Sequence, residues 1–222
     1  MIPYYIIIGM ITYLIGSVNF SILISKKKAG FDIREKGSGN AGTTNMLRTL
    51  GKGAAIITLL LDILKGIAAI YISIFYGFIL YKLGNINLNY AILVQVAGIM
   101  VIIGHTYPIY FGFKGGKGVA TALGILLITN WHIGLICLVF AVVLIAITKM
   151  VSVGALGGAI LFPVLTLFTY ETYFIEPGNY IVYSILIAII ICFNHRDNIK
   201  RLMNGEENKL SFKKTNEGEK IK

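Results

Sequence analysis

The chain has 222 residues, of which 56% are hydrophobic and only 14% are charged. Soluble domains carry close to a quarter charged residues, so this composition excludes an ordinary water-soluble protein and indicates an integral membrane protein. The formal net charge of +10 would suit a nucleic-acid-binding protein, but no such motif accompanies it. In a membrane protein, basic residues report orientation and attraction to anionic lipid. We therefore expect the lipid bilayer, and no nucleic acid, among the partners.

Apolar segments that meet or approach the length of a membrane span follow one another along the chain. A spanning helix needs roughly 20 mostly apolar residues. The fourth and seventh segments are short, which leaves open a half-span or a bent hairpin. We expect an all-α, polytopic membrane helix bundle of about seven spans, with a transmembrane domain at 1–203 and a polar tail at 204–222. The predicted spans are 2–25, 54–81, 91–109, 118–130, 132–148, 150–170 and 180–193.

The basic residues between these segments are distributed unevenly. If the amino terminus lies outside, nearly all lysines and arginines outside the spans fall on the inner side. The outer side then receives only Lys82, Glu171 and Glu176. An excess of lysine and arginine marks the cytoplasmic side of a membrane protein. The sequence therefore predicts an external amino terminus and a cytoplasmic carboxyl terminus.

Two glycine-rich polar segments fall on the predicted cytoplasmic side. The first reads "GSGNAGTTNMLR" at 37–48, where glycine backbones, hydroxyls, amides and a guanidinium can converge on an anion. The second reads "GFKGGKG" at 112–118 and precedes an apolar helix, whose amino terminus attracts anions. A phosphate group is the expected ligand. The candidate ligands are Ser38, Asn40, Thr44, Asn45, Arg48, Lys114, Gly115, Gly116, Lys117 and Gly118.

Other polar residues are expected on the same side or just inside it. His195, in "NHRDNIKRL", can act as donor, acceptor or base near neutral pH, and Ser152 follows a basic turn. Asp62 and Lys65 lie one helical turn apart within a predicted span, where pairing lowers the cost of burying them. They form either a structural pair or part of the site. His105 is interpreted as a hydrogen-bonded packing residue that supports this polar interior.

Several familiar motifs are matched in part by the residue pattern but lack the structural context or the residues that they require. Gly37, Gly39 and Gly42 have dinucleotide-binding spacing, but no strand precedes them and no βαβ unit surrounds them. The "GFKGGKG" segment lacks both the spacing and the Ser/Thr of a Walker A loop. No GxSxG elbow occurs, and Cys137 and Cys192 lie in apolar stretches without further cysteine or histidine clusters. We therefore expect no nucleotide, metal or other cofactor.

Four sequence blocks together carry a specific resemblance. In order, "GSGNAGTTNMLRTLGKGAA", "LDILKG", "GHTYPIYFGFKGGKGVAT" and "NHRDNIKRL" resemble the bacterial membrane glycerol-3-phosphate acyltransferases that use acyl-phosphate as donor. The likeness runs from about residue 16 to residue 202. It implies a seven-helix inner-membrane enzyme that transfers a fatty acyl group from acyl-phosphate to the 1-hydroxyl of sn-glycerol 3-phosphate. The products would be 1-acyl-sn-glycerol 3-phosphate (lysophosphatidic acid) and phosphate, in the first step of bacterial phospholipid synthesis.

The resemblance also implies roles for individual residues and a partner. Catalytic positions would be His195, Ser38, Lys117 and Asn198, and the remaining candidates would bind substrate or support the site. Whether His195 or the substrate's own phosphate accepts the hydroxyl proton stays open. A soluble enzyme that makes acyl-phosphate is an expected partner. One departure concerns Asn19, which stands where the family usually has proline at the end of the first span, and it puts the bend there in doubt.

Two other functions compete with an enzyme. A carrier of a small phosphorylated metabolite also builds anion sites from helix amino termini and basic side chains, but near the membrane midplane with access from both sides. A scaffold without chemistry would explain the spans but not the clustered polar segments. Because those segments gather on one side, the sequence favours an active site on the cytoplasmic face.

Overall fold

The computed structural model describes residues 1–168 and 177–210. All regular secondary structure in these ranges is helical, which confirms the all-α prediction for this part of the chain. Glu171, Glu176, the end of the predicted span 150–170 and residues 211–222 of the tail lie outside the described residues. The elements are α1 (Ile2–Ser17), α2 (Phe20–Ala29), η1 (Ile33–Glu35), α3 (Thr43–Gly84), α4 (Tyr90–Thr106), η2 (Ile109–Phe111), α5 (Val119–Thr129), α6 (Trp131–Thr148), α7 (Val151–Thr166), α8 (Pro177–Asn194) and α9 (Arg196–Met203).

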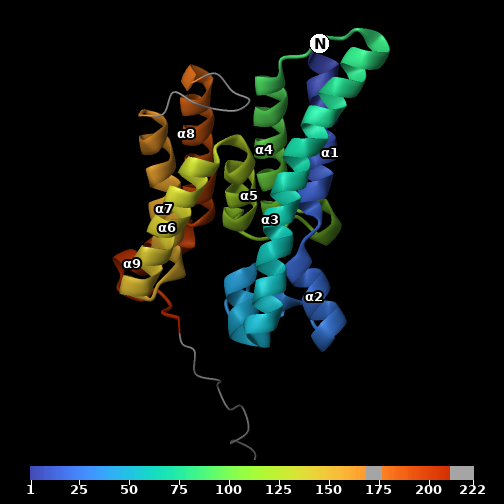
Figure 1. Cartoon of the computed structure of the whole chain (residues 1–222). Helices are drawn as coiled ribbons and strands as arrows, with labels where there is room; N and C mark the ends of the chain where they lie inside the picture. Colours follow the sequence, from blue (N-terminus) through green and yellow to red (C-terminus); the bar gives the residue numbers. More distant parts are fainter. Residues whose placement is uncertain (169–176, 211–222) are drawn as a thin grey trace, which may run out of the picture.

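The helices form two groups joined by α5. Figure 1 shows α1, α3 and α4 on one side, α6, α7 and α8 on the other, and the short α5 between them. Helices α3 and α5 pack closely through two glycines. A Cβ atom on Gly66 would lie 2.3 Å from the Thr121 carbonyl oxygen, and one on Gly124 would lie 2.1 Å from that of Ile63. Only glycine permits this approach. The contact fixes the position of α5, the helix that directly follows the second glycine-rich segment.

Each predicted span overlaps one or two helices, but the structure does not establish seven crossings. Within the described residues, four helical stretches are long and apolar enough to span a membrane: Ile2–Ala29, Thr43–Gly84, Tyr90–Phe111 and Trp131–Thr148. A fifth is added if α8 and α9, which are bent by 63°, count as one span. Helices α5 and α7 are apolar but shorter. The outward apolar side chains of α6, such as Val139 and Ile147, are exposed, as expected for contact with lipid.

The stretch predicted as one span at 2–25 is broken at Val18 and Asn19. The Asn19 side-chain oxygen accepts a hydrogen bond from the Ile22 amide at 3.2 Å and caps the amino terminus of α2. Its amide nitrogen donates to the Ala41 carbonyl oxygen at 3.3 Å. The helix is therefore interrupted at this departure from the family pattern and Asn19 caps the part that follows, while Ile2–Ala29 still counts as one candidate span. Unbroken hydropathy across the break had concealed it.

Helix α3 begins earlier than the predicted span at 54–81. It starts at Thr43, and Gly51, with φ of 82°, interrupts its helical geometry. Thr44, Asn45 and Arg48 therefore lie on the first helical turns. The start of α3, α2 and α9 all lie at the end of the molecule opposite the amino terminus (Figure 1). The polar segments thus gather at one end of the bundle.

Candidate functional site

The first glycine-rich segment is held by Asn45. Its side-chain oxygen accepts from the Ser38 amide at 2.9 Å, and its nitrogen donates to the carbonyls of Ile33 and Lys36 at 3.0 and 2.9 Å. Asn45 is fully buried, so its amide is committed to the backbone of residues 33–38. Ser38 is exposed and Asn40 is half-buried. Asn45 therefore shapes the segment on which Ser38 is presented.

The second glycine-rich segment folds back on the end of α4. The amides of Gly115 and Gly116 donate to the carbonyls of Thr106 and His105 at 3.0 and 3.1 Å. A Cβ on Gly116 would lie 2.1 Å from the His105 Nε2 atom and 2.7 Å from the Ala41 carbonyl oxygen. Only glycine fits at this point, because both segments meet there. Gly118, with φ of 86°, then caps α5, and Lys114 remains exposed.

Lys117 connects this segment to α9. Its ammonium donates to the Asn198 side-chain oxygen, and the Asn198 nitrogen donates to Glu207 Oε1 at 2.8 Å. Glu207 Oε2 accepts from Arg201 Nε at 3.0 Å, and its side chain is buried. The carboxylate thus orients the asparagine so that its oxygen faces the lysine. Glu207 lies in the predicted tail. Nothing in the charge pattern of the sequence distinguished it from the other charged residues there.

The electrostatic environment of Lys117 favours its neutral form more than water does. Burial lowers the pKa of Lys117 to about 8, with Arg201 and Arg48 also lowering it and Glu207 partly opposing them. At pH 7 the lysine is therefore still mainly an ammonium, but it is close to titration. An incoming dianion would restore the charged form, since an adjacent opposite charge raises the pKa of a lysine.

His195 follows α8 directly and has a defined tautomer. Its Nδ1 atom lies 2.8 Å from the Ile191 carbonyl oxygen, which only accepts hydrogen bonds, so Nδ1 carries the proton. The Nε2 atom is then an acceptor. Nearby on the chain, Asn194 donates to the carbonyl oxygen of Lys117 at 3.3 Å. This bond holds the end of α8, where His195 lies, next to the backbone of Lys117.

The Asp62–Lys65 pair expected within one span is present. The Lys65 ammonium lies 2.9 Å from Asp62 Oδ1 and donates to His105 Nδ1 at 2.8 Å. It also donates to the carbonyls of Gly16 and Val18 at the end of α1, at 3.2 and 2.9 Å. All three charged or ring side chains are buried. His105 is thus a hydrogen-bonded packing residue, and its ring backs Gly116.

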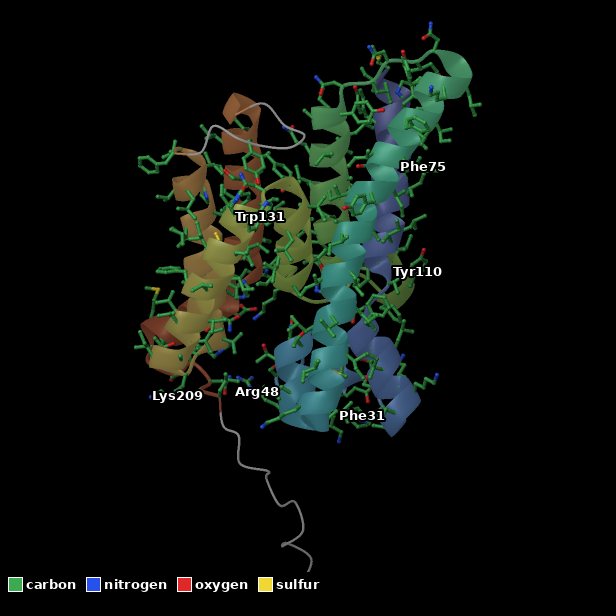
Figure 2. The ribbon with its side chains drawn as sticks, in the orientation of Figure 1. Phe31, Arg48, Phe75, Tyr110, Trp131 and Lys209 are labelled. Carbon is green, nitrogen blue, oxygen red and sulfur yellow. The ribbon has the colours of Figure 1, made fainter. Side chains whose placement is uncertain are left out.

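The carboxyl-terminal residues in the described range link the two helix groups. Arg48 donates to the Asn208 carbonyl oxygen at 3.4 Å, and the Leu210 amide donates to the carbonyl of Lys149 at 2.7 Å. Figure 2 shows Arg48 beside Lys209, at the end opposite the amino terminus. Ser152, in the first turn of α7, is buried, and its hydroxyl has no hydrogen-bond partner among the described residues. Such a group is a ready donor to a ligand.

An apolar cavity of about 90 Å³ opens beside this polar site. Val119 follows the second glycine-rich segment directly, and Ile191 is the residue whose carbonyl binds His195. Val119 and Leu138 are each 37% exposed, so the cavity reaches the outer surface of the bundle. Its wall combines side chains of α5, α6, α7 and α8: Val119, Ala122, Leu123, Leu126, Cys137, Leu138, Ala141, Gly154, Ala155, Gly158, Ala159, Phe162, Ile187 and Ile191.

Comparison with known proteins decides the family. The family profile described as "Glycerol-3-phosphate acyltransferase" matches residues 6–205. The chain belongs to the glycerol-3-phosphate acyltransferase family. A glycerol-3-phosphate acyltransferase of Clostridioides difficile (strain 630) is 40% identical over 210 residues, covering 95% of this chain and 97% of its own. One of Shouchella clausii (strain KSM-K16) is 44% identical over 201 residues, covering 90% and 93%.

Solved structures support the same assignment. The acyltransferase resembles the crystal structure of PlsY (YgiH), an integral membrane glycerol 3-phosphate acyltransferase, in its glycerol 3-phosphate form. The TM-score is 0.77 at 33% identity, with 93% of this chain and 96% of that chain covered. A lysophosphatidic acid form of PlsY gives a TM-score of 0.74 at 31% identity, with 93% and 95% covered. The chain is therefore a multi-pass membrane acyltransferase of this family.

The structure of the acyltransferase brings some of the predicted residues into contact, in separate groups. Lys117 contacts Asn198 in α9, and Asn194, the neighbour of His195, contacts the Lys117 backbone. Arg48 contacts the carboxyl-terminal residues through the Asn208 carbonyl. The backbones of Gly115 and Gly116 are used to fold the segment. Arg34 and Glu207 were not among the predicted site residues. A signal for Arg34 existed in the "DIR" sequence, where an acidic residue two positions earlier can orient it.

Proposed function

We propose that this acyltransferase uses acyl-phosphate as donor and acylates the 1-hydroxyl of sn-glycerol 3-phosphate. The products are 1-acyl-sn-glycerol 3-phosphate, which is lysophosphatidic acid, and inorganic phosphate. The observation that carries the proposal is the bonded pair of Lys117 and Asn198 next to an apolar cavity, whose lining begins at Val119, two residues after Lys117. A phosphate on an acyl chain requires this combination of a cationic site and an apolar channel. The glycerol 3-phosphate and lysophosphatidic acid forms of PlsY support the same substrate and product.

The two phosphates are held by the polar ends of the two glycine-rich segments. Lys117 supplies charge from one segment, while Ser38 and Arg48 supply a hydroxyl and a guanidinium from the other. Further binding groups are Asn40, Thr44, Lys114, Gly118 and the buried hydroxyl of Ser152. The start of α3 and the start of α5 both direct backbone N–H groups toward this end of the bundle. Asn45, Gly115 and Gly116 contribute by shaping the segments.

The reaction needs little from the protein beyond alignment. The 1-hydroxyl oxygen attacks the acyl-phosphate carbonyl carbon, the bond from that carbon to the phosphate oxygen breaks, and the departing phosphate leaves as a stabilised anion. We place Lys117 between the two phosphates: it binds that of glycerol 3-phosphate and, with Asn198, stabilises the charge that develops on the departing one. His195 Nε2 accepts a hydrogen bond from the hydroxyl and orients it, and the hydroxyl proton passes to His195 or to phosphate. Because the mixed anhydride is already activated, no covalent enzyme intermediate or cofactor is required.

The acyl chain lies in the apolar cavity between α5, α6, α7 and α8. Burying each methylene group contributes about 0.8 kcal/mol, so even part of a fatty chain provides substantial binding energy. The small side chains of Ala155, Gly158 and Ala159 leave the space. The open rim at Val119 and Leu138 admits the chain from the bilayer.

The same proposal includes the orientation and location of the protein. We place it in the bacterial inner membrane as a bundle of about seven spans at 1–203, with an external amino terminus. The active site and the tail at 204–222 then face the cytoplasm. The excess of basic residues at the end of the molecule that carries α2, α9 and the glycine-rich segments supports this orientation. A soluble enzyme that produces acyl-phosphate would deliver the donor at that face.

One reconstitution tests the proposed function. The purified protein is given long-chain acyl-phosphate and glycerol 3-phosphate without nucleotide or metal, and the products are identified by mass spectrometry. Formation of 1-acylglycerol 3-phosphate with equimolar phosphate is the expected result. Absence of product from acyl-phosphate, together with product from acyl-CoA or acyl carrier protein, would overturn the assigned donor. Uptake of labelled glycerol phosphate into sealed vesicles without acylation would instead identify a carrier.

A further inference from the structure

Arg34 joins the two glycine-rich segments, although it belongs to neither. It lies in η1, four residues before Ser38, and its Nη1 atom donates to the carbonyl oxygens of Phe111 and Lys114. These distances are 2.6 and 3.0 Å. Both acceptors lie in the turn that leads to Lys117, 77 and 80 residues away in sequence. One guanidinium therefore anchors one end of the second segment to the first.

The orientation of this guanidinium is set by Asp32. The two carboxylate oxygens of Asp32 accept from Arg34 Nε at 2.9 Å and from Nη2 at 2.8 Å. Asp32 also accepts from the Arg34 backbone amide at 3.1 Å, and Lys26 lies 3.3 Å from it. This paired fork geometry is the arrangement that arginine adopts and lysine cannot. The bond from Arg34 lowers the pKa of the Asp32 carboxyl to about 2, so the pair is charged throughout the working range of pH.

The contacts leave Arg34 unsuited to bind phosphate directly. All three guanidinium nitrogens are already bonded to Asp32 or to backbone carbonyls. Its charge is balanced by a carboxylate that is only 8% exposed. Arg34 itself is 25% exposed, so it lies beneath the surface of the site. What it controls is the separation of the segments that carry Ser38 and Lys117.

We propose that Arg34 is a positioning residue that sets the spacing of the two phosphate-binding segments, with Asp32 fixing its orientation. This inference rests on the proposed function, because the spacing matters only if the two segments hold two reacting substrates. Each segment keeps its own anion-binding groups when the Arg34 link is lost. Substrates should then still bind but meet in poor alignment, and misplacement by about 1 Å can cost a hundredfold in rate.

The test compares Arg34→Lys, Arg34→Gln and Asp32→Asn with the parent enzyme. All three should lower kcat at least tenfold at saturating substrates, while the Kd for glycerol 3-phosphate alone, measured by calorimetry, changes less than threefold. Combining Asp32→Asn with Arg34→Gln should add little to either change. Hydrogen exchange at amides 112–118 should accelerate in each variant. Lys27→Ala, which removes an exposed basic residue of α2 without described side-chain contacts, serves as the control and should match the parent.

Four other outcomes have distinct meanings. Near-parent kcat in Arg34→Lys would overturn the proposal, since charge alone would then suffice. A Kd that rises tenfold or more with kcat preserved would also overturn it, and would make Arg34 a phosphate ligand. A fall in melting temperature with normal kcat per folded molecule would reduce the pair to a stabilising role. If the parent itself forms no acylglycerol phosphate, the proposed function fails, and the exchange rates at 112–118 still decide whether Arg34 anchors that segment.

Discussion

Raising the pH should weaken glycerol 3-phosphate binding through a single side chain, Lys117. With a pKa of about 8, this lysine is an ammonium below pH 8 and becomes a neutral amine above it. The second pKa of a phosphate monoester lies near 6, so the substrate is already a dianion from pH 7 upward. Its protonation therefore does not change over the range of interest. Titration of the lysine is then the dominant change in the complex formed by these two partners.

The magnitude follows from the charged fraction of the lysine. A group with a pKa of about 8 is roughly 90% charged at pH 7 and roughly 10% charged at pH 9. If the bound dianion keeps Lys117 charged, the Kd for glycerol 3-phosphate should rise about tenfold between these values, or about 1.4 kcal/mol. The sign follows from the loss of a positive charge: the favourable interaction is nearly complete at pH 7, declines through pH 8 and is mostly lost at pH 9.

Calorimetric titration with glycerol 3-phosphate alone checks this, because no reaction occurs without the donor. Lys117→Arg is the matched control, since arginine stays charged up to pH 12. Its affinity is expected to differ from that of the parent but to stay constant between pH 7 and pH 9. A parent Kd that is constant over this range would refute the role of Lys117 in binding this phosphate. The same tenfold loss in Lys117→Arg would assign the titration to another group.

Five further substitutions test the site, the cavity and the packing around them. Lys117→Ala, Arg48→Ala and His195→Ala should each remove most turnover in the acyl-transfer assay while circular dichroism in detergent stays unchanged, and near-normal activity in two of them would remove this site assignment. Gly158→Leu places a side chain in the 90 Å³ cavity and should reduce turnover of long-chain acyl-phosphate more than tenfold but that of acetyl phosphate little; equal losses would place the chain elsewhere. Gly116→Ala should destabilise the protein by about 1–3 kcal/mol in thermal unfolding, because its Cβ meets His105 Nε2, and an unchanged melting temperature would contradict this packing.

Hydropathy located the helices, because a helix that contacts lipid needs a long apolar stretch. It did not predict the helix end at a point where a polar side chain interrupts the helix inside such a stretch. The break at Asn19 is hard to see in the hydropathy of residues 2–25, because it needs only one polar capping side chain, which accepts from the Ile22 amide at the start of α2. The early start of α3 was hidden for the opposite reason. Residues 43–50 mix polar side chains with Met46, Leu47 and Leu50, so they lack the long apolar run that marks a span, although they are helical up to the interruption at Gly51.

Side-chain chemistry singled out Lys117, Asn198 and His195, and the structure bonds the first two to each other and the neighbour of His195 to the Lys117 backbone. It could not distinguish ligands from residues that shape the backbone. Asn45 was expected to donate to phosphate, yet its amide is committed to three backbone groups of residues 33–38. Arg34 escaped notice because two of its partners are carbonyl oxygens, which every residue possesses. The Asp62–Lys65 contact was predictable from helical spacing, whereas the third member, His105, comes from another helix.

The rim of the apolar cavity at Val119 and Leu138 gives the two substrates different geometries of supply. Glycerol 3-phosphate reaches the site from bulk water, in three dimensions. A fatty donor that enters between helices reaches it from the plane of the bilayer, in two dimensions. Turnover should consequently follow the mole fraction of donor in the surrounding lipid or detergent rather than its amount per litre. Dilution with inert detergent at constant donor would then slow the enzyme, and the acylated product would be released directly into the leaflet it helps to build.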